Sequence, residues 1–368
     1  MTAPVHIAQA LAWVDAATPR LETEEVALRD AAERVLAEDI RAAAPIPPHD
    51  RAALDGFAVS ASDSISAGIY SPLSLPTIAV AAGDAMPEGM DTVVPLDRGL
   101  LEGDDRVLLV EAVAAGDGVE RQGTAADAGD LLAAAWTRLA PRHIGLLAVA
   151  GLTRAPVARR PRVRITIAGS VRSGDAGDSD GPMLRAAVTR DGGIIAETVL
   201  ADAFAAGADI ILVVGGTGPG RADVAAAALA AAGEVAIHGI ALRPGETAGF
   251  GRIAAGTPVL LLPGAPHACL WTYELFAGRA IRRLAGRDPC LPYRKLEMTT
   301  ARKIVSAIGM AEIWAVHYRP DGLVEPIASL AEIGLPAAAE AAGFVIVPEA
   351  SEGYPQGAAV TVYLYDDR

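Results

Sequence analysis

The spacing of hydrophobic residues divides the chain into parts with different expected structures. At the N-terminus, apolar positions recur at helical spacing, which predicts helices over residues 5–16 and 24–37. From residue 44 to 119 the apolar runs are short and lie between Gly, Asp and Pro, which predicts a β-rich unit. The strands expected in that unit cover residues 57–59, 77–81, 92–95 and 106–110.

Further along, residues 157–287 alternate between strand and helix patterns. Strands are expected at 163–168, 194–199, 210–214, 235–240 and 258–262, and helices at 182–190, 201–206, 224–232 and 269–284. This alternation predicts a three-layer α/β unit around a parallel sheet, with ligand-binding loops at the carboxyl ends of the strands. From residue 288 the chain returns to strand patterns and predicts a C-terminal β domain. Its five expected strands cover 297–304, 311–318, 322–328, 343–349 and 358–365.

The stretch from Asp209 to Asp223, DIILVVGGTGPGRAD, combines a buried strand pattern with a glycine-rich turn and a following helix. Such a turn presents unpaired N–H groups and the positive end of the helix dipole, so it suits a phosphate. Its spacing matches neither the dinucleotide fingerprint nor a P-loop, which also requires a Lys. A tight strand-to-helix connection without a ligand therefore stays open, as does an ordinary helix N-cap for Asp223.

Composition narrows the classes of function. A chain of 368 residues predicts two to four domains, and its formal net charge of −14 disfavours extended contact with nucleic acid. No apolar run approaches the roughly 20 residues of a membrane span. Cys269 and Cys290 are too few for a disulfide framework, and the N-terminal stretch lacks an export signal. We therefore expect a cytoplasmic protein that contacts neither membrane nor nucleic acid.

Six loop motifs follow one another along almost the whole chain. They are PIPPHDRAALDGFAV, AAGDAMPEGMDTVV, RQGTAADAGDLL with a following TRL, VVGGTGPGRAD, ALRPGETAGFG and LPGAPHACLWTYELF. In this order and spacing they resemble the motifs of the MoeA/gephyrin E-domain family, the molybdopterin molybdenumtransferases. Each match alone is modest, and the resemblance rests on all six together.

The resemblance implies an elongated homodimer built from four domains. These are an N-terminal helical and linker domain (1–43 with 120–156), a β-rich insertion (44–119), a molybdopterin-binding α/β domain (157–287) and a C-terminal β-barrel (288–368). It also implies a reaction in molybdenum cofactor biosynthesis. Family members hydrolyse adenylylated molybdopterin with a divalent metal, here expected to be Mg²⁺, insert molybdenum from molybdate and release AMP. A molybdoenzyme that receives the cofactor is an implied partner.

Residue by residue, the motifs imply a candidate site. Asp55 and Asp223 match acids that the family uses around metal and pyrophosphate, so we expect both to be catalytic and to bind the metal. The expected molybdopterin-binding residues lie in the other matched loops: Ser179, Gly215, Gly216, Thr217, Gly218, Gly220, Arg221, Arg243, Pro244, Gly245, Pro263 and Gly264. For Asp55 an ordinary Asp-Gly turn stays open.

Several departures from the family pattern bear on catalysis. Ala82 replaces a Thr, and Thr124 with Ala125 replaces the Glu-Asp of a G-E-D motif. Glu246 stands where the family has a Lys, and its charge would repel a phosphate. Because divalent cations need two or more hard oxygen ligands, the loss of acids favours a reduced or displaced metal site. A catalytically impaired protein that binds, carries or senses the cofactor is therefore the alternative, and a purely interacting protein is a third.

Overall fold

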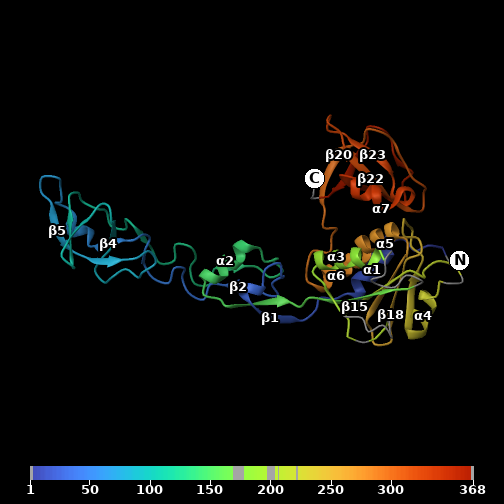
Figure 1. Cartoon of the computed structure of the whole chain (residues 1–368), viewed down its shortest axis with the longest axis horizontal. Helices are drawn as coiled ribbons and strands as arrows, with labels where there is room; N and C mark the ends of the chain where they lie inside the picture. The colour runs from blue at the N-terminus through green and yellow to red at the C-terminus, as the bar shows by residue number, and fades with distance from the viewer. Residues whose placement is uncertain (1–2, 169–177, 197–203, 206, 221–222, 366–368) are drawn as a thin grey trace. The chain divides into compact units, whose positions relative to one another are not determined.

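The computed structural model describes the chain except residues 1–2, 169–177, 197–203, 206, 221–222 and 366–368 (Figure 1). The described chain forms two compact units. Unit 1 comprises Met1–Glu24 with Ala158–Arg368, and unit 2 comprises Glu25–Val157. The expected four-domain division stays a prediction beside these two units.

Unit 1 is organised around a six-stranded sheet. Its strand order is β14 (Ile194–Ile195), β13 (Arg162–Ile167), β15 (Ile210–Val214), β19 (Pro258–Leu262), β18 (Gly249–Ile253) and β16 (Gly233–His238). The four strands from β14 to β19 are parallel, whereas β18 and β16 continue the sheet in antiparallel pairing. The sheet is therefore mixed, whereas the alternation of elements had predicted a parallel sheet; β18 begins within the loop motif ALRPGETAGFG.

Helices cover both faces of this sheet. In β15, Ile210, Leu212 and Val214 pack on one face in the same core as the helices α1, α3, α5 and α6, while Ile211 and Val213 pack on the other face with α4 (Figure 1). The helices are α1 (Ile7–Ala17), α3 (Asp180–Arg190), α4 (Ala225–Ala232), α5 (Pro266–Thr272) and α6 (Gly278–Leu284). The expectation that this strand is buried on both faces is confirmed.

The helix expected at 269–284 is confirmed with an interruption. It begins three residues earlier, at Pro266, and a π-helical turn, Tyr273–Ala277, separates α5 from α6. The helix expected at 201–206 and the end of the strand expected at 194–199 lie largely outside the described residues.

All five strands expected in the C-terminal part are confirmed. They are β20 (Arg294–Thr299), β22 (Ala311–Tyr318), β23 (Val324–Ser329), β24 (Gly343–Val347) and β26 (Ala359–Leu364). They pair in the order β22-β24-β26-β20, and β23 pairs with the other edge of β22. A bridge between Thr300 and Val324 joins β23 to the residue that follows β20. The described structure adds a helix that the pattern did not predict, α7 (Leu330–Glu340), and the short strands β17 (Leu242–Arg243), β21 (Ile304–Val305) and β25 (Gly353–Tyr354).

Unit 2 contains the expected β-rich insertion. Two three-stranded sheets form there, in the orders β6-β4-β7 and β5-β9-β8. Their strands are β4 (Gly56–Val59), β5 (Leu73–Pro76), β6 (Ile78–Val80), β7 (Thr92–Pro95), β8 (Leu100–Glu102) and β9 (Arg106–Leu109). The rest of the unit holds α2 (Pro141–Val149) and the strands β2 (Ile40–Arg41), β3 (Arg51–Ala52), β10 (Val119–Glu120) and β11 (Leu131–Ala133).

The helix predicted over residues 24–37 is wrong. That stretch contains a strand, β1 (Thr23–Ala27), and a 3₁₀ turn, Leu28–Asp30. The strand β1 pairs with β12 (Arg154–Ala158), and the amide of Leu28 donates to the carbonyl of Thr153 at 2.9 Å. The distant partner strand offers ladder hydrogen bonds that local helix propensity does not outweigh. Among the described helices, none is long and apolar enough to cross a membrane.

Candidate functional site

Three loops leave the sheet of unit 1 at one edge. Because β13, β15 and β19 are parallel and in register, their last residues lie side by side: Ile167 pairs with Val214, and Val214 with Leu262. The main chain continues this alignment beyond the strands, since the amide of Gly215 donates to the carbonyl of Leu262 at 2.9 Å. The carboxyl edge of the sheet thus gathers the loops that carry the predicted site.

Glycines allow these loops to approach backbone to backbone. Gly215 and Gly216 have φ angles of 84° and 64°, in the left-handed region that glycine adopts without strain. A Cβ atom on Gly215 would lie 2.7 Å from the carbonyl oxygen of Ala168, and one on Gly264 would lie 3.0 Å from the Cα of Gly215. A Cβ atom on Gly215 would clash with the backbone, and one on Gly264 would require the neighbouring backbone to shift, so contact between the loops explains these two glycines.

Asp223 holds the glycine-rich loop together. Its Oδ2 accepts a hydrogen bond from the amide of Gly220 at 2.8 Å, and its own amide donates to the carbonyl of Gly220 at 3.0 Å. A Cβ atom on Gly218 or on Gly220 would lie 2.8 Å from the same Oδ2. The helix α4 begins two residues later, with Val224 as its N-cap and no side-chain cap. The helix-cap alternative for Asp223 is therefore wrong.

The loop from Arg243 to Thr247 joins this edge through two threonines. The Oγ1 atoms of the buried Thr217 and of Thr247 are 2.9 Å apart. Arg243 is exposed and precedes Pro244 through a cis peptide bond. Its Nε lies 3.8 Å from Oε1 of Glu246, the acid that the sequence had marked as unfavourable for a phosphate. Part of the positive charge of Arg243 is therefore already compensated.

The N-terminus of α3 brings two further acids to the same edge. Asp178 accepts a hydrogen bond at Oδ1 from the amide of Gly181 at 2.8 Å, and Ser179 precedes the helix without a side-chain cap. Asp180 is the first helical residue and is only 8% exposed. Burial, and then the charge of Asp178, raise the pKa of Asp180 to about 6. Sequence reasoning missed Asp180, although two acids separated by one residue, Asp178 and Asp180, precede the expected helix in the sequence.

Asp55 belongs to unit 2, so it is described within that unit. Its Oδ1 accepts a hydrogen bond from the amide of Ala82 at 2.7 Å, which links the two acid-rich motifs of the insertion. Asp50 has a similar role, since its Oδ1 accepts from the amide of Gln122 at 2.8 Å. Arg221 lies outside the described residues. Of the predicted site, the structure thus gathers the residues of unit 1 other than Arg221 at one edge.

Two family models match this chain. One, described as the MoeA N-terminal region (domain I and II), matches residues 5–151, and the other, described as a probable molybdopterin binding domain, matches residues 164–283. The chain belongs to the MoeA family. The second match covers the sheet edge and every loop described above in unit 1.

Relatives and a solved structure agree with the MoeA assignment. The molybdopterin molybdenumtransferase 2 of Mycobacterium tuberculosis is 29% identical over 321 residues, which cover 75% of this chain and 79% of that protein. The molybdopterin molybdenumtransferase of Bacillus subtilis is 28% identical over 408 residues, covering 98% and 94%. The crystal structure of the molybdopterin biosynthesis moeA protein from Pyrococcus horikoshii OT3 is 26% identical, covers 98% of this chain and 100% of its own, and has a TM-score of 0.68.

In this MoeA-family chain, the carboxylate of Asp223 would hold a cation only together with oxygens from a substrate phosphate and water. Within the described ranges, no three side chains of His, Cys, Asp or Glu come together as a metal-binding group. Asp223 uses one oxygen for Gly220, and a carboxylate has about four lone-pair sites. Mg²⁺ in phosphate-binding sites is commonly held by one or two carboxylates, with substrate phosphates and water as its other ligands.

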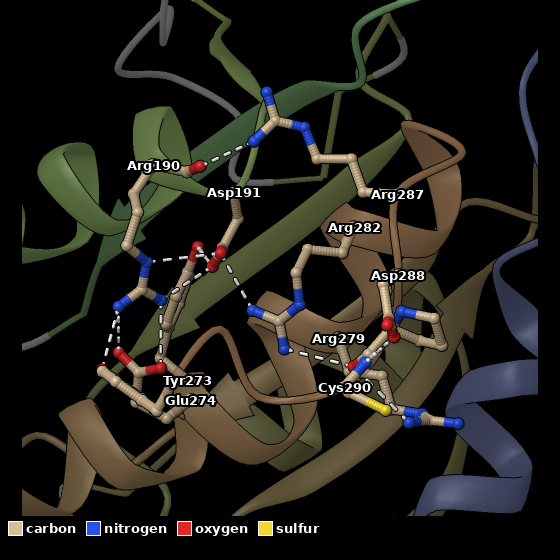
Figure 2. Close-up of polar contacts among 11 residues, drawn as sticks. Arg190, Asp191, Tyr273, Glu274, Arg279, Arg282, Arg287, Asp288 and Cys290 are labelled. Carbon is tan, nitrogen blue, oxygen red and sulfur yellow. Dashed lines mark hydrogen bonds and ion pairs between the residues drawn. The ribbon is translucent and has the colours of Figure 1, made fainter. Parts of the chain in front are cut away.

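At its other end, α3 takes part in a buried ionic network that the sequence did not predict (Figure 2). Arg190 donates to both carboxylate oxygens of Glu274 at 2.8 and 3.0 Å. Asp191 accepts from Arg282 and from the hydroxyl of Tyr273, each at 2.9 Å. Burial raises the pKa of Glu274, and Arg190 opposes that shift. The π-helical turn supplies Tyr273 and Glu274, so the network ties α3 to the α5–α6 segment.

Proposed function

We propose that this MoeA-family protein inserts molybdenum into molybdopterin. In the proposed reaction, water cleaves the phosphoanhydride of adenylylated molybdopterin and AMP leaves. The two dithiolene sulfurs then bind the molybdenum of molybdate, and their two protons leave with one molybdate oxygen as water. The observation that carries the proposal is the convergence of three matched loops at one sheet edge: residues 215–220 with 223, residues 243–247 and residues 263–264.

This edge has the chemistry that an anionic pterin phosphate requires. The glycine-rich loop leads into α4, and α3 also begins at the edge, so the positive ends of both helix dipoles lie there. Arg243 adds an exposed guanidinium group, which suits bidentate contact with a phosphate. A local cation matters because the chain as a whole carries a formal net charge of −14.

The two acids are assigned different parts. Asp223 would hold Mg²⁺ together with the phosphate oxygens of the substrate, while it keeps the loop closed through Gly220. Asp55 is proposed as the second catalytic acid, and within unit 2 its carboxylate accepts a hydrogen bond from the amide of Ala82. When bound, Mg²⁺ neutralises the charge that develops on the pyrophosphate. The proposal also includes a homodimer, the four-domain division, a C-terminal barrel and a recipient molybdoenzyme.

A second candidate function is binding without catalysis. This candidate is favoured by Glu246, because its Oε1 lies 3.8 Å from Nε of Arg243 and lowers the positive charge available to a pyrophosphate. A protein of this kind would carry or sense the finished cofactor. It would retain the pterin and release no AMP.

One assay separates the two candidates. Purified protein is incubated with adenylylated molybdopterin, molybdate and Mg²⁺, and both AMP and bound pterin are quantified. We expect AMP release that Asp55→Ala and Asp223→Ala each abolish, while Asp104→Ala, an exposed acid outside the site, keeps the wild-type rate. Bound pterin without AMP would reject the enzyme and leave the carrier.

A further inference from the structure

The first residue of α3 has a feature that its fold does not explain. The Asp180 side chain is buried at 8% exposure, and its Oδ1 has no hydrogen-bond partner in the described part of the chain. Buried polar atoms in proteins almost always have a partner. An unpaired carboxyl oxygen at the start of an eleven-residue helix therefore points to a ligand that contacts it there.

The neighbouring side chains leave this oxygen without a partner. Asp178 turns its carboxylate back onto the amide of Gly181, and its negative charge faces Asp180. Burial raises the pKa of the Cys269 thiol in α5, and the nearby charge of Asp180 raises it further. Neither group donates to the carboxyl oxygen or neutralises its charge.

On the other elements that pack on α3, two arginines of α6 are engaged elsewhere, and α5 carries one imidazole, the half-buried His267, whose Nδ1 would lie 3.9 Å from a Cβ on Gly334 of α7. On α6, Arg279 pairs with Asp15, and Arg282 pairs with Asp191. Strand β14 has no ionisable residue. On β13, Val163 and Ile165 pack toward α3, so the side chain of Arg164, between them in the strand, points to the opposite face of the sheet. In the described ranges, the Oδ1 of Asp180 has no hydrogen-bond partner, cationic or neutral.

We propose that Asp180 makes anion binding at this sheet edge depend on pH. When its carboxyl group carries a proton, it donates a hydrogen bond to an oxygen of a tetrahedral anion. When it is ionised, it repels the same oxygen. The inference rests on the proposed molybdopterin site, and it adds a selecting residue to that site. Two kinds of ligand fit this description, phosphate esters and molybdate, because both present the oxygens of a tetrahedral anion.

Burial also raises the pKa of the Asp180 carboxyl group to about 6, so this group titrates within the pH range in which binding can be measured. Below that pH the neutral acid is available as a donor. Above it, the ionised form dominates and affinity for an anion falls by up to about tenfold per pH unit.

The test measures molybdate binding by calorimetry from pH 5 to 8 with the whole protein, and inorganic phosphate binding in a second arm. Molybdate at submillimolar concentration is the main probe, because in dilute solution it stays a monomeric dianion over this range. We expect wild-type affinity to fall at least tenfold between pH 6 and pH 8. Asp180→Asn, whose amide stays a neutral donor, should change less than about twofold. If the affinity for only one of the two anions falls with pH, that anion is the one that contacts Asp180.

Two further variants keep the test decisive if Asp180→Asn fails to fold. Asp178→Asn removes the neighbouring charge and should move the midpoint of the fall to lower pH. Asp104→Asn, exposed in unit 2, should follow the wild type. The inference is rejected if Asp180→Asn retains the wild-type pH dependence, if Asp178→Asn leaves the midpoint unchanged, or if molybdate does not bind at pH 5. Adenylylated molybdopterin run in parallel separates the two proposals, because absence of pterin binding at every pH rejects the proposed function itself.

Discussion

Gly264 lies against Gly215 so closely that a Cβ atom on Gly264 would be 3.0 Å from the Cα of Gly215. This contact joins the loop after β19 to the loop after β15. Gly264→Ala should therefore push the loops apart, cost about 1–3 kcal/mol of unfolding free energy and weaken pterin binding at least about tenfold.

Urea denaturation and pterin titration check this expectation. Gly145→Ala is the matched control, because Gly145 lies in α2 and a Cβ there meets nothing within 4 Å. It should leave pterin binding unchanged and raise stability by about 0.5–1 kcal/mol. Wild-type pterin affinity in Gly264→Ala would show that the contact does not shape the site.

Removal of Arg190 should destabilise the protein more than most substitutions. It would leave Glu274 and Asp191, each with a side chain no more than 2% exposed, without their shared cation. We expect Arg190→Ala to cost about 3–5 kcal/mol. The loss should be smaller at pH 5 than at pH 8, since the unpaired Glu274 then takes up a proton more readily. Arg190→Met with Glu274→Gln should recover part of the loss, and urea curves at both pH values measure it.

Asp180 should also make stability depend on pH. Its folded pKa of about 6 lies above the ordinary value of 3.8, so its ionised form is disfavoured in the folded state. The unfolding free energy of the wild type therefore matches that of Asp180→Asn below pH 4, and it falls below that of the variant as the pH rises through 6. We expect Asp180→Asn to be more stable than wild type by about 2–3 kcal/mol at pH 7.5 and nearly equal at pH 4. Equal stability at both values would contradict the raised pKa.

Glu246→Gln should strengthen anion binding. The change releases Arg243 from an acid 3.8 Å away, and both side chains are about half exposed, so the gain is limited by solvent screening. We expect two- to fivefold tighter molybdate binding at low ionic strength, on the order of 1 kcal/mol or less, and little gain in high salt. Glu234→Gln, exposed on β16, should have no effect. Unchanged affinity would place the anion away from Arg243.

Two substitutions of Asp223 should distinguish the role of its hydrogen bond to Gly220 from the role of its negative charge. Asparagine retains an oxygen that can accept from the amide of Gly220, whereas alanine does not. Asp223→Asn should therefore keep pterin binding within about threefold and lose Mg²⁺-dependent AMP release. Asp223→Ala should lose both. Pterin binding and AMP release measured side by side check this, and equal behaviour of the two variants would reject a role for the charge.

Several elements were predictable because their signal is local. The apolar run of β15, the glycines after it and the five C-terminal strands follow from neighbouring residues alone. Residues 24–37 were mispredicted because Thr23–Ala27 pairs with Arg154–Ala158, more than a hundred positions away. The antiparallel β18 was missed for the same reason, since ladder partners in β16 and β19 compensate for its two glycines.

The sequence by itself determined the order of the elements, the glycine-rich loop and the motifs that mark the MoeA family. Only the tertiary structure decided which atoms meet: Gly264 against Gly215, Asp223 on Gly220 in place of a helix cap, and the buried Oδ1 of Asp180, which has no hydrogen-bond partner among the described residues. The reason is physical. Strand and turn preferences act between neighbours in the chain, whereas burial and hydrogen bonding depend on segments that are distant in sequence and adjacent only after folding.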